Sequence, residues 1–188
     1  MTLPYETLSD SQMIQEMKGI EKIQGPGGLI FLWVTGRAIE LGIECLDQWG
    51  YTLVEEIVWI KVNQLNRLIR TGMTGHWLNH TKEHCLVGLK GKGPHGELPV
   101  DFEKDFRLKA DLDIIVSEVR ETSRKPDELY HLIDRLISSN YSKQTPSQEI
   151  RKLEIFAREN NLREGWLSLG NQLPPTHIID PILRENLK

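Results

Sequence analysis

An uninterrupted apolar run, Leu29–Val34, is the feature that most constrains what this chain can fold into. The run follows a glycine-rich turn at residues 25–28 and shows no alternation of polar and apolar residues. A strand with one face in water alternates the two kinds of side chain, so this strand is expected to be buried on both faces. The chain should therefore build a sheet with helices on both sides.

The segments after this run alternate between helical and strand-like patterns. A helix is predicted from the candidate N-cap Thr35 to about Trp49. Its buried face is expected to carry Ile39, Ile43 and Leu46. Further strands are predicted from branched and apolar residues at Leu53–Val62, Cys85–Leu89, Leu112–Val116, Lys152–Phe156 and Trp166–Leu169.

A second helix is predicted from both its start signals and its periodicity. Pro126 suits a first helical position, and Asp127 and Glu128 complement the dipole of the first turn. Apolar residues then recur on one helix face, at Leu129, Leu132, Ile133, Leu136 and Ile137. Strands alternating with helices predict an α/β fold with a mainly parallel, doubly wound sheet in a single domain over residues 1–188. Ligands of such sheets lie beyond the carboxyl ends of the strands.

Composition excludes several classes of protein. No apolar run approaches the roughly 20 residues that span a bilayer, so no membrane segment is expected. The first ten residues lack the charge and apolar pattern of a signal peptide. Cys45 and Cys85 have no metal-type spacing, which favours buried free thiols of an intracellular protein over a disulfide.

The charge is distributed unevenly along the chain. The formal net charge is −4, yet residues 61–93 hold six Lys or Arg against a single acidic residue, Glu83. Clustered cations attract phosphates, so this stretch suits a local polyanion contact. A solvated loop without a specific role is an equally good interpretation.

Polar side chains follow two of the predicted strands. Arg158, Glu159, Asn160 and Asn161 come directly after the strand at 152–156. They could bind the sugar or base of a nucleotide-like ligand. Because the sequence has no glycine-rich phosphate loop, a ligand without phosphates is favoured. An ordinary polar turn is the alternative.

Two further positions could complete such a site. Asn171 and Gln172 follow Gly170 after the strand at 166–169, although Gly-Asn is also a common turn signal. Lys125 precedes the helix that begins at Pro126, and a cation beside helix N–H groups can hold a carboxylate or phosphate. The alternative is an ordinary surface lysine that precedes a proline.

Three long segments lack a regular pattern. Residues 64–81 are expected to form a structured contact loop that exposes Arg67, Arg70, Trp77 and His80. The spacing of His76, His80 and His84 resembles a metal motif, but no carboxylate or cysteine completes a set, so no metal is predicted. Long loops are predicted at 90–110 and 138–149, and loops of this length are usually functional or mobile.

Three stretches, Thr74–Gly88, Ile155–Asn161 and Trp166–Leu173, carry a family resemblance. They resemble the adenine-N6 methyltransferase family, most closely the branch that writes m6A in mRNA. The resemblance implies a Rossmann-like, S-adenosylmethionine-dependent enzyme that methylates RNA in the nucleus. DNA as the substrate, or a catalytically inactive nucleic-acid-binding subunit, are the alternatives it leaves open.

The resemblance also implies roles for individual residues. Those expected at S-adenosylmethionine are Lys125, Arg158, Glu159, Asn160, Asn161, Asn171 and Gln172. Those expected at the substrate or its gate are Tyr5, Ser123 and Arg124. Those expected to contact a homologous, inactive methyltransferase-like subunit or the nucleic acid are Arg67, Arg70, Trp77, His80 and Glu83.

The catalytic motif of the family is absent from this chain. Family members carry Asp-Pro-Pro-Trp just before a segment that matches Leu3–Pro4–Tyr5, and here that segment opens the chain. Truncation is the expected cause, and the missing piece would also supply an N-terminal strand. A sheet edge left uncovered in this way can pair with other chains, so poor behaviour in solution without the partner is predicted.

Overall fold

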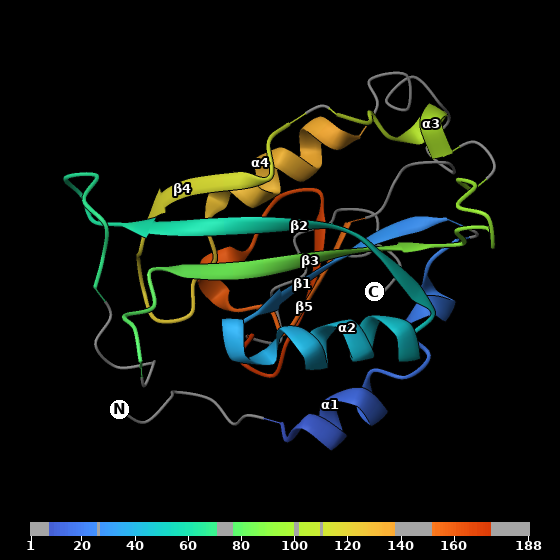
Figure 1. The fold of residues 1–188 in the computed structure, drawn as a ribbon, viewed down its shortest axis with the longest axis horizontal. Coiled ribbons are helices and arrows are strands. Elements are labelled where there is room, and N and C mark those ends of the chain that lie inside the picture. Colours follow the sequence, from blue (N-terminus) through green and yellow to red (C-terminus); the bar gives the residue numbers. More distant parts are fainter. Residues whose placement is uncertain are drawn as a thin grey trace, which may run out of the picture. The chain divides into compact units, whose positions relative to one another are not determined.

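The computed structural model describes residues 8–25, 27–70, 77–99, 102–109, 111–137 and 152–173 (Figure 1). These residues divide into two compact units. One, here called the four-stranded unit, comprises the described residues from 8 to 120 and from 126 to 137. The other, the two-stranded unit, comprises residues 121–125 and 152–173. The expectation of a single domain over residues 1–188 stays a prediction.

The four-stranded unit holds a mixed sheet with the order β1-β3-β2-β4 (Figure 1). Its strands are β1 (Gly28–Val34), β2 (Tyr51–Val62), β3 (Lys82–Lys90) and β4 (Ile114–Glu118). β3 is antiparallel to both of its neighbours, whereas β4 is parallel to β2. The α/β class is confirmed, but the sheet of this unit is not mainly parallel.

The reversed direction of β3 has a topological cause. A helix connects β1 to β2, and these two strands point the same way with the width of one strand between them. β3 fills that gap. It follows β2 through residues 63–81, and the described part of this connection contains no helix to return the chain for a parallel pairing.

The helices and 3-10 turns of the four-stranded unit lie before, between and after its strands. They are α1 (Asp10–Glu16), η1 (Ile20–Ile23), η2 (Gly36–Ala38), α2 (Ile39–Gln48), α3 (Phe102–Asp105) and α4 (Asp127–Leu136). α1 begins with a capping box formed by Ser9 and Gln12. α3 lies inside the segment that was expected to be a loop at 90–110, while the expected loop at 138–149 falls outside the described residues.

The helix after β1 differs in detail from the prediction. Thr35 precedes the 3-10 turn η2 and makes no side-chain cap bond to it, so α2 begins only at Ile39. Ile43 is 41% exposed and does not face the sheet. Gly42 does, and a Cβ there would lie 2.9 Å from the Leu86 side chain. The close approach of helix and sheet therefore depends on a glycine that carries no periodic signal.

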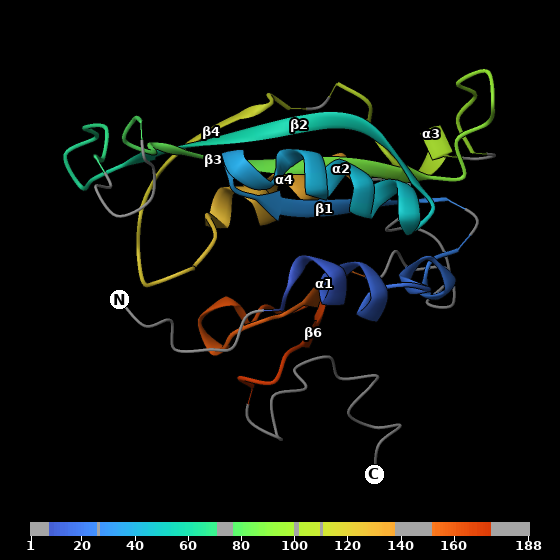
Figure 2. The same cartoon turned by 60° about the horizontal axis from the view of Figure 1, so that its bottom comes forward.

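Opposite faces of the sheet carry separate cores. Cys85 and Val87 of β3 point into the core covered by α4, and Leu86 between them points into the core covered by α2. This alternation confirms the prediction of helices on both faces for this unit. α1 lies beside α2 in both views and is tied to it by the Trp49 Nε1–H, which donates to the Ile14 carbonyl at 3.1 Å (Figure 2).

α4 confirms most of its predicted stripe. Leu129 and Leu132 are buried, and Ile133 and Leu136 pack against the same core. Pro126 is the N-cap with extended backbone, one position earlier than predicted.

The two-stranded unit pairs β5 (Lys152–Ile155) with β6 (Trp166–Leu169). The two strands are parallel, in agreement with the predicted direction, and β6 has the predicted bounds. β5 ends one residue earlier than predicted, because Phe156 adopts the left-handed conformation with φ of 60°. The 3-10 turn η5 (Glu159–Asn161) follows.

Both cysteines are buried free thiols, as predicted. Within the described parts of the chain, none of the helices has the length and apolar character needed to cross a membrane.

Candidate functional site

The turns after β5 and β6 lie side by side. The strands pair in parallel from Lys152 with Trp166 to Ile155 with Leu169, so their carboxyl ends meet at one edge. The pairing continues beyond β5, where the Ala157 N–H donates to the Leu169 carbonyl at 2.9 Å. The polar residues 158–161 and 171–172, predicted from separate segments of the sequence, are thereby brought together.

Gly170 makes this close approach possible. A Cβ at this position would overlap the carbonyl oxygen of Ala157 and lie 3.0 Å from its nitrogen. Both obstacles are backbone atoms, which cannot move aside as a side chain can. The sequence marked Gly170 only as a turn residue, and its contact partner, 13 residues earlier, left no local signal.

Two asparagine oxygens in η5 are candidates for ligand contacts. Asn161 is only 6% exposed, and its Nδ2 donates to Glu154 Oε1 at 3.2 Å. The Oδ1 atoms of Asn160 and Asn161 are buried and accept no hydrogen bond from the part of the chain that the structure describes. A buried acceptor without a donor costs free energy, so these two oxygens suit a ligand that carries hydroxyl or amine donors.

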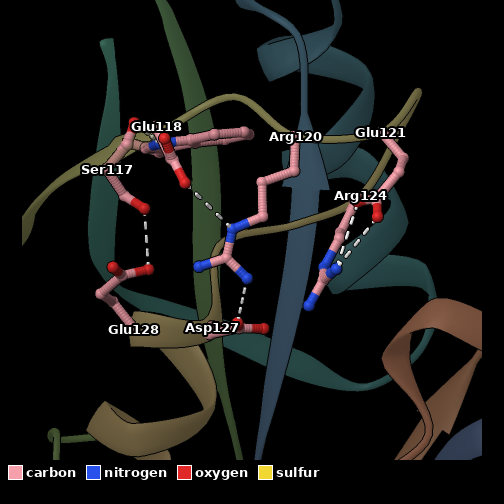
Figure 3. Close-up of polar contacts among 8 residues, drawn as sticks. Ser117, Glu118, Arg120, Glu121, Arg124, Asp127 and Glu128 are labelled. Atoms are coloured by element: carbon pink, nitrogen blue, oxygen red, sulfur yellow. Dashed lines mark hydrogen bonds and ion pairs between the residues drawn. The ribbon is translucent and has the colours of Figure 1, made fainter. Parts of the chain in front are cut away.

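The loop that contains Lys125 belongs to the same unit. Residues 121–125 group with β5 and β6, whereas the strand before them and the helix after them belong to the four-stranded unit. The guanidinium of Arg158 donates to the Thr122 carbonyl. Lys125 is half-buried, and Arg124 pairs with Glu121 at 3.2 Å (Figure 3).

The residues on either side of this loop are tied together within the four-stranded unit. Arg120, the last residue before the loop, pairs with Asp127 in the first turn of α4 and lies 3.8 Å from Glu118 (Figure 3). Ser117 Oγ donates to Glu128 Oε2 at 2.9 Å. The strand before the loop and the helix after it are therefore tied together by side chains, of which the sequence indicated only a helix-dipole role for Asp127 and Glu128.

Three of the residues predicted to bind the cofactor are accessible. Glu159, Asn171 and Gln172 are exposed at the carboxyl edge of β5 and β6. Tyr5 lies outside the described residues. Whether any of these side chains contacts a cofactor stays a prediction.

The predicted contact loop at 64–81 is described only in part, because 71–76 fall outside the described residues. Arg67 and Arg70 are exposed, His80 is half-buried and Trp77 is 91% exposed. Large exposed apolar side chains accompany them, at Leu65, Leu68 and Leu78. A shallow pocket of about 300 Å³ is lined by Asn63, Gln64, Leu65, Ile69 and Val119.

The basic stretch at 61–93 is less available than its sequence suggests. Lys61 pairs with Glu83 at 2.5 Å and lies over the ring of Trp59, and both charges are largely buried. Lys90 donates to backbone carbonyls, including that of Gln24 at 3.0 Å. Two of the six cations therefore make contacts within the chain. Glu83, which was expected at the partner or nucleic-acid interface, pairs with Lys61 of the same chain.

Of the three histidines with metal-like spacing, His80 and His84 lie within the described residues. His84 is buried on β3, where its Nδ1 contacts Glu56, and His76 lies outside the described residues. No three His, Cys, Asp or Glu side chains within the described ranges are placed to hold a metal ion.

Comparison with known proteins gives three informative relatives. The chain is 52% identical over all of its 188 residues to the "Probable N(6)-adenosine-methyltransferase MT-A70-like" protein of Oryza sativa subsp. japonica, of which it covers 23%. It is 51% identical over 181 residues, 96% of the chain, to the "N(6)-adenosine-methyltransferase catalytic subunit METTL3" of Homo sapiens, of which it covers 27%. It is 34% identical over 158 residues, 82% of the chain, to the "N(6)-adenosine-methyltransferase non-catalytic subunit METTL14" of Xenopus tropicalis, of which it covers 32%.

The chain thus spans about a quarter to a third of the length of these relatives. The sequence profile of the MT-A70 family matches residues 1–172 and includes both strand ends of the candidate site. With this match and the identities above, the chain belongs to the MT-A70 family.

Proposed function

We propose that this chain is part of a methyltransferase that uses S-adenosylmethionine to methylate the exocyclic N6 amine of adenine in RNA. Relatives named N6-adenosine-methyltransferases match all or nearly all of the chain with about half of the aligned positions identical. The proposed fold of the complete protein is a Rossmann-like methyltransferase sheet, of which the described strands would form a part.

The grouping of three polar segments carries the proposal. Lys125 in the loop at 121–125, the turn at 158–161 and the turn at 171–172 were predicted to bind one cofactor, and all three segments lie in the two-stranded unit. The buried oxygens of Asn160 and Asn161 fit the hydroxyl and amine donors of an adenosine moiety.

The chain's own residues would bind and orient the cofactor. S-adenosylmethionine supplies a methyl group activated by a sulfonium. We assign Lys125 to the carboxylate of its methionine end, because an ammonium beside an anion forms a charge-assisted hydrogen bond. Asn160, Asn161, Asn171 and Gln172 would hold the adenosine end. Fixing both ends restrains the methyl group, and such positioning can supply about 7–11 kcal/mol of a barrier.

The catalytic interpretation is favoured over that of an inactive subunit. The chain is 51% identical to a relative named as the catalytic subunit and 34% identical to one named as non-catalytic. An inactive subunit would be expected to show the opposite order. DNA as the substrate is the remaining alternative, since flipping adenine out of either nucleic acid presents the same amine.

The relative named as a non-catalytic subunit suggests the kind of partner. Because a homologous subunit is named non-catalytic, we propose that this chain pairs with a subunit of the same family. The loop at 64–81 is the proposed contact, since Trp77, Leu65 and Leu68 expose large apolar side chains beside Arg67 and Arg70. Such a mixture of aromatic, apolar and arginine side chains is typical of interface anchors.

The cofactor assignment is tested by titration. In the full-length protein with its partner, Lys125→Ala and Asn171→Ala should each weaken S-adenosylmethionine binding. A lost hydrogen bond to a charged or buried group costs roughly 1.5–3 kcal/mol, which is about ten- to a hundred-fold in affinity. Lys92→Ala, at an exposed lysine of the four-stranded unit, is the matched control. Unchanged affinity in both site variants would remove these residues from the pocket.

The loop assignment is tested separately. Arg67→Ala with Arg70→Ala should weaken partner or RNA binding and leave S-adenosylmethionine affinity nearly unchanged. Arg37→Ala, an exposed arginine in η2, serves as the control. Loss of cofactor affinity with normal partner and RNA binding would contradict the assignment. Methyl transfer to matched RNA and DNA oligonucleotides distinguishes the two substrates.

A further inference from the structure

The loop before Lys125 contains a tight turn with an unfavourable residue in it. The Arg124 N–H donates to the Glu121 carbonyl at 3.0 Å, which closes a four-residue turn. Ser123, its third residue, has φ of 64°, whereas Thr122 is not among the residues with positive φ. The hydrogen bond and the signs of the two φ angles match a type II turn, which favours Gly or Asn where Ser123 stands.

A competing turn is available to the same four residues. A type I turn keeps the bond between Glu121 and Arg124 and gives both central residues negative φ, which suits serine better. The two turns differ mainly by rotation of the peptide plane between Thr122 and Ser123. The direction of the Thr122 carbonyl therefore reports which turn is formed, and something must favour the type II form.

Arg158 supplies that preference. Its guanidinium donates to the Thr122 carbonyl, the group that would turn away in a type I turn. A charge-assisted bond of this kind is stronger than one between neutral groups. The surroundings reinforce it, because Arg124 pairs with Glu121 across the turn and Arg120 pairs with Asp127 at the loop's flanks.

We propose that Arg158 is a positioning residue that holds the Thr122–Ser123 peptide in its type II orientation and so sets the place of Lys125. The inference rests on the proposed S-adenosylmethionine site, in which Lys125 takes the carboxylate. Arg158 directly precedes η5, which carries Asn160 and Asn161. Arg158, beside the turn proposed to hold the adenosine end of the cofactor, would thereby control the position of the loop at 121–125, whose Lys125 is proposed to hold the methionine end. This role differs from the direct contact with the cofactor that the sequence predicted for Arg158.

The coupling can be tested without any ligand. Ser123→Gly and Ser123→Val are made in the full chain, each with Arg158 present and with Arg158→Ala. With Arg158 present, glycine should raise Tm by about 2 °C, because it removes the cost of positive φ. In the Arg158→Ala background the turn relaxes to type I and the same glycine should lower Tm. An equal Tm shift from Ser123→Gly in both backgrounds would overturn the proposal.

Calorimetric titration with S-adenosylmethionine then tests the consequence for the site. Arg158→Ala should weaken binding about ten-fold, as is typical of coupled sites, and adding Ser123→Gly should recover much of the loss. Ser123→Val should weaken binding although Arg158 is intact, and Arg158→Lys, which keeps a cationic donor, should bind better than Arg158→Ala. Ser123 variants that leave affinity unchanged would show that Arg158 acts only by direct contact. If the unchanged protein binds no S-adenosylmethionine, the proposed function fails, while the ligand-free Tm comparison still decides the coupling.

Discussion

Replacing Gly170 with alanine should separate the two turns of the candidate site. The new methyl group would overlap the Ala157 carbonyl oxygen and lie 3.0 Å from its nitrogen and 3.1 Å from its carbonyl carbon. Positive φ plays no part here, because Gly170 is not among the glycines with positive φ. The effect of the substitution is therefore a steric one.

The expected magnitude follows from what the methyl group meets. Overpacking against movable side chains costs about 1–3 kcal/mol, and here the obstacle is the backbone of a paired strand end. Relief requires the strand ends to move apart, which stretches the 2.9 Å bond from the Ala157 N–H to Leu169 and forfeits about 1 kcal/mol more. We expect a loss of about 2–4 kcal/mol, or a Tm lower by roughly 4–16 °C for a chain of this size.

The assay is thermal unfolding followed by S-adenosylmethionine titration of whatever stays folded. Gly25→Ala is the control, because a Cβ at Gly25 meets no atom within 4 Å. Cofactor affinity should fall with Gly170→Ala even at temperatures where the protein remains folded, since the turns at 158–161 and 171–172 no longer align. A Gly170→Ala protein with the Tm and the affinity of the Gly25→Ala control would refute the steric argument.

Three further predictions concern the four-stranded unit. Gly42→Ala should destabilise it by about 1–3 kcal/mol in urea unfolding, because the added Cβ lies 2.9 Å from Leu86 across the helix–sheet contact. The pKa of Asp111 is lowered because hydrogen bonds from the next backbone N–H and from Arg135 outweigh the effect of burial, so Asp111→Asn should cost up to about 1 kcal/mol at pH 7. That cost should begin to shrink as the pH falls below about 4, the unfolded pKa, and should be lost once the pH passes below the lowered pKa of folded Asp111. Burial, with nearby carboxylates, raises the pKa of the Cys45 thiol, so Ellman's reagent at pH 8 should modify it slowly in the native protein and rapidly in denaturant.

Local patterns predicted the elements of this fold better than their pairing. β6 has the predicted bounds, and the stripe of α4 packs as its spacing indicates. The reversed direction of β3 had no local signal, since an apolar run such as Cys85–Leu89 reads alike in a parallel and an antiparallel sheet. The absence of a predicted helix between β2 and β3 was the only indication that β3 is antiparallel. The prediction instead followed the rule that strands alternating with helices form parallel sheets.

At the candidate site, the sequence indicated which polar side chains take part but not which backbone atoms lie close together. The segments at 158–161 and 171–172 were found because polar residues follow a predicted strand. The asparagine oxygens without donors and the closeness of Gly170 to Ala157 depend on atoms brought together by pairing of β5 with β6. A residue pattern within one segment of the sequence cannot predict such contacts between two segments.

Backbone strain gives a second reason why local reasoning fails at this site. Phe156 and Ser123 both have positive φ, a conformation that bulky or ordinary side chains rarely adopt, and both belong to the two-stranded unit that holds the candidate site. Propensity rules assign neither residue to such a position, so each must be held there by its surroundings. For Ser123 the structure supplies the holding group, Arg158, and for Phe156 it supplies the continued pairing of Ala157 with Leu169. The positive φ angles of Ser123 and Phe156 are therefore imposed by the rest of the site and not favoured by the residues themselves. Substitutions at these two positions should change ligand binding before they change the fold.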